Sequence, residues 1–191
     1  MMTLKSFQKI LMLGIILGSV AFAGPVSYSA ILTGPSENPP NASPGTGTAQ
    51  VIIDVIAHTL SVSASFSGLL ANVSAAHIHC CATAPANVGV AVGAVGFPVG
   101  VTGGVYAHVF NTSLDGTFGG AFRTANGGTA AGAEAALAAG LAAGRAYFNI
   151  HTSAFPGGEI RGFFTEDVPE PATFVLAGFA LAGLALRRRL R

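Results

Sequence analysis

The chain has 191 residues, of which 51% are hydrophobic and only 9% are charged, whereas globular proteins average roughly a quarter charged. The formal net charge of +1 averages over segments of opposite sign, because residues 24–168 hold three arginines, no lysine and seven acidic residues, a net charge of −4. Such a body lacks the electrostatic footprint of a nucleic-acid-binding protein. The sequence contains neither Gly-x-Ser-x-Gly nor Gly-x-x-x-x-Gly-Lys, so hydrolase and nucleotide-binding roles have no support.

Residues 1–23 have the organisation of a secretory signal peptide. Two lysines precede the apolar run 10–22, and the segment ends in Ala-Phe-Ala, the small-x-small form of a signal-peptidase site. We therefore expect signal peptidase to cleave between Ala23 and Gly24. A buried N-terminal helix is the alternative interpretation.

Alternating apolar and polar residues predict strands over 26–33, 49–57 and 60–66. Residues 34–47 hold four prolines and are expected to form a loop. A tight hairpin at 58–59 would join the second and third strands, with His58 exposed in the turn. Because serines alternate with apolar residues in the third strand, we expect an antiparallel sheet with one wet face.

The stretch 75–81 gathers two of the five histidines and both cysteines. If its backbone is extended, His77 and His79 lie on one face and Cys80 lies on the other. Neutral imidazole is the commonest metal ligand, so the pair is a candidate for two ligands of a metal site. The alternative is a pair of core or rim histidines that hydrogen-bond the backbone.

Residues 82–104 are rich in glycine, alanine, proline and valine and are expected to form a long loop. Two short strands are expected next, over 105–110, which contains His108, and over 117–122.

The alanine-rich segment 129–143 predicts one helix. Leu137 and Leu141 lie four residues apart and form a narrow apolar stripe, and Gly144 suits the C-terminal cap. Strands are expected to follow over 145–151 and 158–165.

Four motifs resemble those of the CHRD domain, in the order found in that family, and together they cover about residues 28–165. They are Gly34-x-x-Glu37-Asn38-Pro39-Pro40, Ala76-His77-Ile78-His79, Asn149-Ile150-His151-Thr152, and Phe155-Pro156-Gly157-Gly158-Glu159-Ile160-Arg161-Gly162. The resemblance implies an all-β fold, which we expect to be an antiparallel β-sandwich of Greek-key type with one short alanine-rich helix. It implies no reaction, because CHRD domains have no general assigned activity.

The last hairpin supplies a third histidine. If its first strand lies beside the strand of His77 and His79, then His151 can join them around one copper or zinc ion, at roughly 2.0–2.1 Å from each nitrogen. His108 is a further candidate ligand, and Asn149 is a candidate partner for orienting one of the rings.

Cys80 and Cys81 are adjacent, and the chain has no other cysteine. Consecutive Cα atoms lie roughly 3.8 Å apart, which is below the usual disulfide range. We expect a vicinal disulfide or free thiols, with soft metal ligands as the alternative.

Glu159 and Arg161 share one face of the last predicted strand. We expect structural roles for both, either as an ion pair or through hydrogen bonds that satisfy the backbone.

The C-terminal segment has three parts: Pro169-Glu170-Pro171, the apolar run 172–186, and an arginine cluster that includes Arg187, Arg188 and Arg189. This pattern resembles the PEP-CTERM sorting signal. The resemblance implies recognition, and in many cases processing, by an exosortase in the inner membrane. A plain C-terminal membrane anchor is the alternative.

These patterns divide the chain into a signal peptide (1–23), a CHRD-like β-sandwich domain (24–167) and a sorting or transmembrane segment (168–191). We expect an exported, membrane-sorted and non-enzymatic module that acts in structure or interaction within the cell envelope or extracellular matrix. It would stay in the inner membrane facing the periplasm, or be released to the outer surface or matrix after tail processing. The alternative is a metal-binding or redox protein that uses His77, His79 and His151. No cofactor other than a copper or zinc ion is expected, and the envelope or matrix partner is not identified.

Overall fold

The computed structural model describes residues 24–167. The predicted signal peptide up to Ala23, Pro169-Glu170-Pro171 and the arginine cluster at 187–189 lie outside the described residues. Within residues 24–167, no helix is both long and apolar enough to cross a membrane.

The described residues form nine strands and two α-helices. The strands are β1 (Val26–Thr33), β2 (Thr46–Asp54), β3 (Thr59–Ser67), β4 (Val73–Cys80), β5 (Val90–Gly93), β6 (Gly104–Asn111), β7 (Ala146–Thr152), β8 (Ile160–Phe163) and β9 (Thr165–Glu166). The helices are α1 (Gly120–Ala125) and α2 (Ala130–Ala142), and short 3₁₀ turns occupy Gly34–Ser36 and Asp115–Thr117. The all-β prediction is confirmed.

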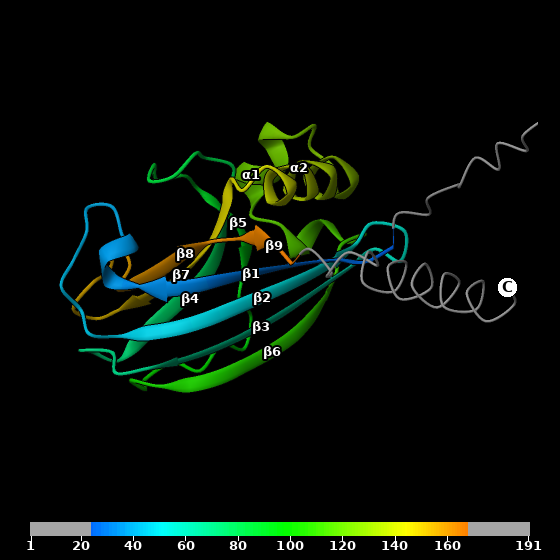
Figure 1. Ribbon diagram of the computed structural model, residues 1–191. Coiled ribbons are helices and arrows are strands. Elements are labelled where there is room, and N and C mark those ends of the chain that lie inside the picture. Colours follow the sequence, from blue (N-terminus) through cyan, green and yellow to red (C-terminus); the bar gives the residue numbers. More distant parts are fainter. Residues whose placement is uncertain (1–23, 168–191) are drawn as a thin grey trace, which may run out of the picture.

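The strands make one curled antiparallel sheet in the order β5-β4-β7-β8-β1-β2-β3-β6, with β9 beside β1 (Figure 1). Strands β1 and β8 share only the pair Thr33 and Arg161, so the sheet turns there from one layer into the other. The layers meet through aromatic rings: Phe97 lies 5.9 Å from Phe148 and 5.0 Å from Tyr106, measured between ring centroids. The hydrophobic core fills the space between the layers.

Strands β2 and β3 show why alternation predicted this half of the sheet. In β3, Leu60, Val62, Ala64 and Phe66 are buried in the core, whereas the serines between them face outward. Because successive side chains point to opposite faces, a period of two residues places one apolar face against the core. The expected wet, serine-lined face is present.

Helix α2 begins and ends as the sequence predicts. The Thr129 hydroxyl caps its N-terminus by accepting a hydrogen bond from the Gly132 amide, which satisfies one of the free amides of the first turn. Gly144 follows with a φ of +63°, a conformation that glycine adopts without strain. Leu137 and Leu141 are buried, so the short apolar stripe anchors the helix.

Two local predictions are wrong. Residues 117–122 are not a strand: a 3₁₀ turn leads into α1, and Phe118 and Phe122 are both buried with their ring centroids 6.4 Å apart. Their spacing of four residues suits one face of a helical turn better than a strand. The expected loop 82–104 also contains β5, which pairs with β4.

Helix α2 packs closely against the disulfide that joins Cys80 and Cys81. A Cβ atom added at Gly140 would collide with the sulfur atoms of both cysteines. Gly140 is therefore the residue that lets the helix approach the end of β4.

We expect Gly140→Ala to destabilise the fold by about 1–3 kcal/mol, the usual cost of overpacking, although alanine is the better helix former by about 1 kcal/mol. Thermal unfolding followed by circular dichroism measures the change. Gly120→Ala is the matched control, because a Cβ there meets no atom within 4 Å. An unchanged or raised melting temperature for Gly140→Ala would contradict the close packing.

Candidate metal centre

Strands β4, β7 and β8 bring the conspicuous polar residues of the chain onto one face of the sheet. The antiparallel register sets His77 opposite Asn149, and Asn149 opposite Arg161. It also sets His79 opposite Tyr147, and Ala75 opposite His151. Directly opposed residues project to the same side, so all these side chains except Ala75 form one polar face. Cys80 points to the other side and is buried in the core.

Three imidazoles converge on this face. One ring nitrogen from each of His77, His79 and His151 can be chosen so that all three lie within 4.8 Å of one another. The closest pair is His77 Nδ1 and His151 Nε2, at 3.1 Å. Nitrogens bound to one ion at roughly 2.0–2.1 Å lie at most about 4.2 Å apart, so the closest pair already has a suitable separation and a small inward movement would complete the site.

Backbone carbonyls fix the orientation of two of the rings. His79 Nδ1 lies 2.8 Å from the Val88 carbonyl oxygen, and His151 Nδ1 lies 2.9 Å from that of Pro156. A carbonyl oxygen only accepts, so each neutral ring carries its proton on Nδ1 and presents the lone pair of Nε2. This is the tautomer that a metal ion requires at Nε2.

The Nε2 atom of His79 is buried and has no hydrogen-bond partner within the described residues. Leaving a buried polar atom unpaired costs free energy, so such an atom needs an explanation. A metal ion held among the three rings would supply the missing partner, and the residues therefore fit a copper or zinc ion.

Burial keeps all three imidazoles in the neutral, metal-binding form. Desolvation, followed by the charges of His151 and His79, lowers the pKa of His77 from 6.5 to about 4. Desolvation also lowers the pKa of His79 and that of His151, although their backbone carbonyl partners act in the opposite direction. The lone pairs are thus available at neutral pH.

Arg161 supports the ring of His79 through the loop between β4 and β5. Its Nη2 donates to the Pro85 carbonyl at 2.7 Å, and its Nη1 donates to Asn87 Oδ1 at 2.6 Å. The next residue of that loop supplies the Val88 carbonyl that orients His79. Tyr147 completes the support, with its ring stacked on His79 at 4.7 Å and the Arg161 guanidinium 4.9 Å from its ring centre.

Two further buried atoms have no hydrogen-bond partner among residues 24–167: Asn149 Oδ1, on this face, and Glu37 Oε1, beside it. A Cβ atom at Gly158 would meet the Asn149 amide at 2.5 Å and Glu37 Oε1 at 2.7 Å, so the two side chains converge on the same glycine. Desolvation raises the pKa of Glu37 to about 7, against the opposing effect of the Arg161 charge. The carboxyl group therefore changes its protonation state near neutral pH.

The structure pairs Glu159 and Arg161 differently from the expected ion pair. Arg161 Nε lies 3.7 Å from Glu37 Oε2 and donates to the Ser36 carbonyl at 2.6 Å. Glu159 instead accepts hydrogen bonds from Ser43, Thr152 and the Leu70 amide. Both residues are fully buried, and both hydrogen-bond backbone groups of neighbouring segments.

The other two histidines lie outside the cluster. His108 is on β6, where its ring centroid lies 4.4 Å from that of Phe110, and it is not among the three converging histidines. His58 is in the β2–β3 turn, as expected, and its Nδ1 lies 2.9 Å from Glu134 Oε2 on α2. Thr112 Oγ1 also donates to Glu134. The sequence did not predict this contact between the β2–β3 turn and α2, because no local pattern links residues so far apart in the chain.

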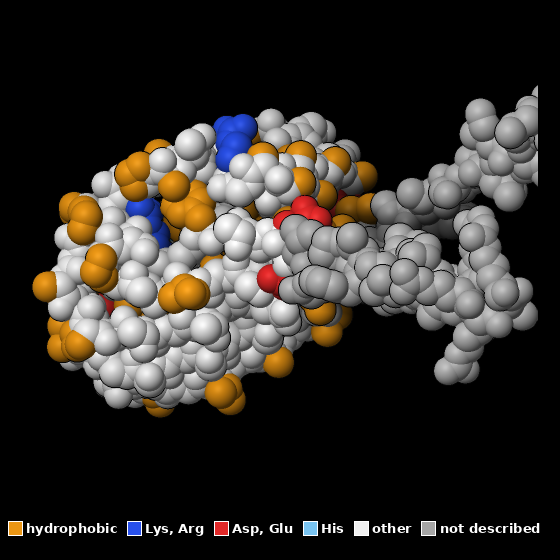
Figure 2. All heavy atoms as spheres, viewed as in Figure 1, with side chains coloured by type: hydrophobic (Ala, Val, Ile, Leu, Met, Phe, Trp, Pro, Cys, Tyr) orange, Lys and Arg blue, Asp and Glu red, His pale blue; other side chains and the backbone are white. Residues whose placement is uncertain are grey.

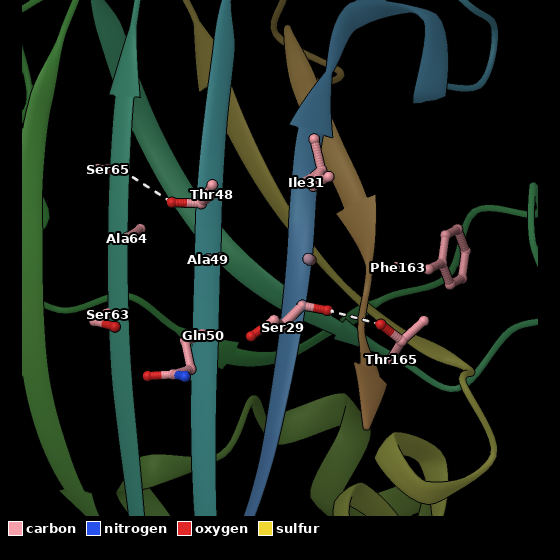
Figure 3. A pocket seen from close by; sticks show the side chains of 11 residues that line it. Ser29, Ile31, Thr48, Ala49, Gln50, Ser63, Ala64, Ser65, Phe163 and Thr165 are labelled. Atoms are coloured by element: carbon pink, nitrogen blue, oxygen red, sulfur yellow. Dashed lines mark hydrogen bonds between the residues drawn. The ribbon is translucent and has the colours of Figure 1, made fainter. Parts of the chain in front are cut away.

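A surface hollow lies away from the histidine cluster, on the outer face of β1, β2 and β3 (Figure 3). Its volume is about 840 Å³, and its lining includes Ser29, Thr48, Gln50, Ser63 and Phe163. None of its lining residues is titratable, although the Asp167 carboxylate accepts hydrogen bonds from two of them, Ser29 and Gln50. The surface seen in Figure 2 is likewise poor in charge, with only isolated basic and acidic groups on the described residues.

Fold and site together define a small all-β domain with a histidine cluster on one sheet face. The chain belongs to the CHRD family, since residues 28–164 match the CHRD domain. Residues 167–189 match the PEP-CTERM protein-sorting motif, so the protein is exported and sorted via the membrane, with recognition by an exosortase-type enzyme. Comparisons with curated proteins and with solved structures found no match.

Proposed function

We propose that this exported CHRD domain binds one copper or zinc ion through His77, His79 and His151. The observation that carries the proposal is the buried Nε2 of His79, which has no hydrogen-bond partner in the part of the chain that the structure describes, on a ring that is clustered with two other neutral imidazoles. Three protein ligands leave a fourth position open, as in catalytic zinc sites. When bound, zinc would supply Lewis-acid chemistry and copper would supply electron transfer.

The residues of this chain would hold and orient the ion rather than move protons. The Val88 and Pro156 carbonyls keep His79 and His151 in the required tautomer. Tyr147 and Arg161 hold the His79 ring in place and cover it from one side. Desolvation keeps the rings neutral, which favours binding without a competing proton.

Elemental analysis of the purified protein after dialysis tests the proposal. We expect about one copper or zinc ion per chain, and a rise in the free energy of unfolding of about 2.7 kcal/mol when free metal stands at 100 times its dissociation constant. His79→Gln and His151→Gln should both lose the metal, whereas His108→Gln should keep it. Equal metal contents in all four proteins, or a wild-type melting temperature that does not change when metal is added, would rule the site out.

We further propose that residues 24–167 form the exported domain, and that it acts as a structural or interaction module of the cell envelope or extracellular matrix. Its hydroxyl-rich outer sheet face supports this role. The domain would face the periplasm from the inner membrane, or reach the outer surface once the tail is processed. Fractionation with mass spectrometry of the mature chain tests this, and a cytosolic protein with an intact Met1 would refute it.

A further inference from the structure

Strand β6 forms one edge of the sheet (Figure 1). On its inner side, Gly104–Asn111 pairs with β3 in an unbroken antiparallel register. On its other side, no strand of the described residues pairs with it. A whole row of main-chain donors and acceptors is therefore directed outward.

The opposite edge of the sheet is covered. Strand β5 has only four residues, and its pairing with β4 shifts register at Ile78 and His79. The Ala91 carbonyl of β5 accepts a hydrogen bond from the Gly119 amide at 2.9 Å, immediately before α1. A Cβ atom at Gly119 would meet the Val90 carbonyl at 2.6 Å, so the segment lies directly against this edge.

Strand β6 carries none of the features that usually keep an edge strand from pairing. It has eight residues, with no proline, lysine or bulge, and proteins commonly use such features to block edge-to-edge association. Two large apolar side chains of this strand are exposed: Val105 is 79% exposed and Val109 is 62% exposed. An open, uncharged and regular edge is a template for another strand.

We propose that β6 pairs antiparallel with β6 of a second copy of this chain, centred on Ala107. This register sets Val105 of each copy opposite Val109 of the other, and Tyr106 opposite His108. Apolar and aromatic cross-strand pairs of this kind stabilise antiparallel sheets. The surface goes beyond the proposed metal site and shares no residue with it.

Three observations favour a second copy over an unrelated strand. The sequence Val-Tyr-Ala-His-Val is self-complementary about Ala107 in this register, as a two-fold interface requires. The strand has no charged side chain that would select a partner of opposite charge. Because the β5 edge is covered, the assembly closes at two copies, and the serine- and threonine-rich outer face becomes continuous across both.

Site-directed cross-linking of the full chain in the cells that export it tests the proposal. With a short bis-maleimide, Ala107→Cys should give a band at twice the protomer mass, because the two positions face each other across the two-fold axis. Ser63→Cys is the matched control, since Ser63 lies beside Ala107 on the neighbouring inner strand and is also exposed. It should give no such band, and the wild type controls for the native cysteines.

A second experiment introduces a charged side chain at the β6 edge. Val109→Lys added to Ala107→Cys should abolish the cross-link, whereas Ile52→Lys, an exposed position on the same face but on β2, should leave it unchanged. Circular dichroism confirms that each variant is folded. The proposal is overturned if folded Ala107→Cys gives no dimer, if Ser63→Cys cross-links equally well, or if the band contains another protein.

Discussion

Replacing Arg161 by methionine is expected to lower the free energy of unfolding by about 3–5 kcal/mol, the range found when one partner of a buried ion pair is removed. The Arg161 side chain is fully buried, and it donates to the Ser36 and Pro85 carbonyls and to Asn87 Oδ1. Methionine fills a similar volume but leaves these acceptors unpaired. Urea unfolding at pH 7 measures the loss.

Arg161→Lys is the control for charge. It keeps a positive group near Glu37, but an ammonium cannot reproduce the planar fork that reaches three separate acceptors. We therefore expect an intermediate loss of stability. If Arg161→Lys were as stable as the wild type, the charge alone would matter, and the loop that orients His79 would not depend on the guanidinium.

The second large effect concerns how the free energy of unfolding depends on pH. His77, on the polar face, and Glu37, beside it, change this free energy in opposite directions. The pKa of His77 is lowered from 6.5 to about 4, so the unfolded chain binds a proton in this window while the folded chain does not. His77 therefore contributes stability that is complete above pH 6.5 and is lost as the pH falls toward 4. The loss amounts to roughly 2–3 kcal/mol after allowance for solvent screening.

Glu37 acts in the reverse direction. Its pKa is raised from 4.5 to about 7, so the folded chain holds a proton that the unfolded chain has released. Its contribution is complete below pH 4.5 and is lost as the pH rises through 7. The two groups thus oppose each other between pH 4.5 and 6.5.

Single variants should separate the two effects. In urea unfolding of the metal-free protein between pH 4 and 7.5, Glu37→Gln should lose stability on acidification more steeply than the wild type, and His77→Gln should lose it less steeply. Ile52→Gln, at an exposed position of β2 without a titratable group, is the control and should leave the shape of the profile unchanged. Parallel profiles for all four proteins would show that neither buried group titrates as its surroundings indicate.

The sequence predicted strands correctly where apolar and polar residues alternate and the apolar side is buried, as in β2 and β3. It was misleading at 117–122, where two phenylalanines spaced by four residues serve a helical turn. It also could not supply the partners of Arg161, because Ser36, Pro85 and Asn87 lie about 75 to 125 residues away and contribute two backbone carbonyls among three acceptors. Every residue has a backbone carbonyl, so residue type does not show which of them will accept a hydrogen bond from Arg161.

The convergence of His77, His79 and His151 could be proposed from the sequence, because two of the four motifs contain these histidines. It depended on one condition that sequence could not test, namely that β4 and β7 are neighbours. The register of β4 and β7 meets that condition. The carbonyls of Val88 and Pro156, which decide the tautomers, were not predictable.

The two ends of the described domain lie together, since the Asp167 amide donates to the Ser27 carbonyl at 2.9 Å. Thr33 lies at the other end of β1, roughly 25 Å along an eight-residue strand, and it is joined in register through Arg161 and Asn149 to His77. In the proposed membrane-attached form, the chain would leave the domain at the Ser27 end of β1. The imidazoles lie toward the opposite end of that strand, so attachment at the C-terminal side would leave the proposed metal site accessible to solutes.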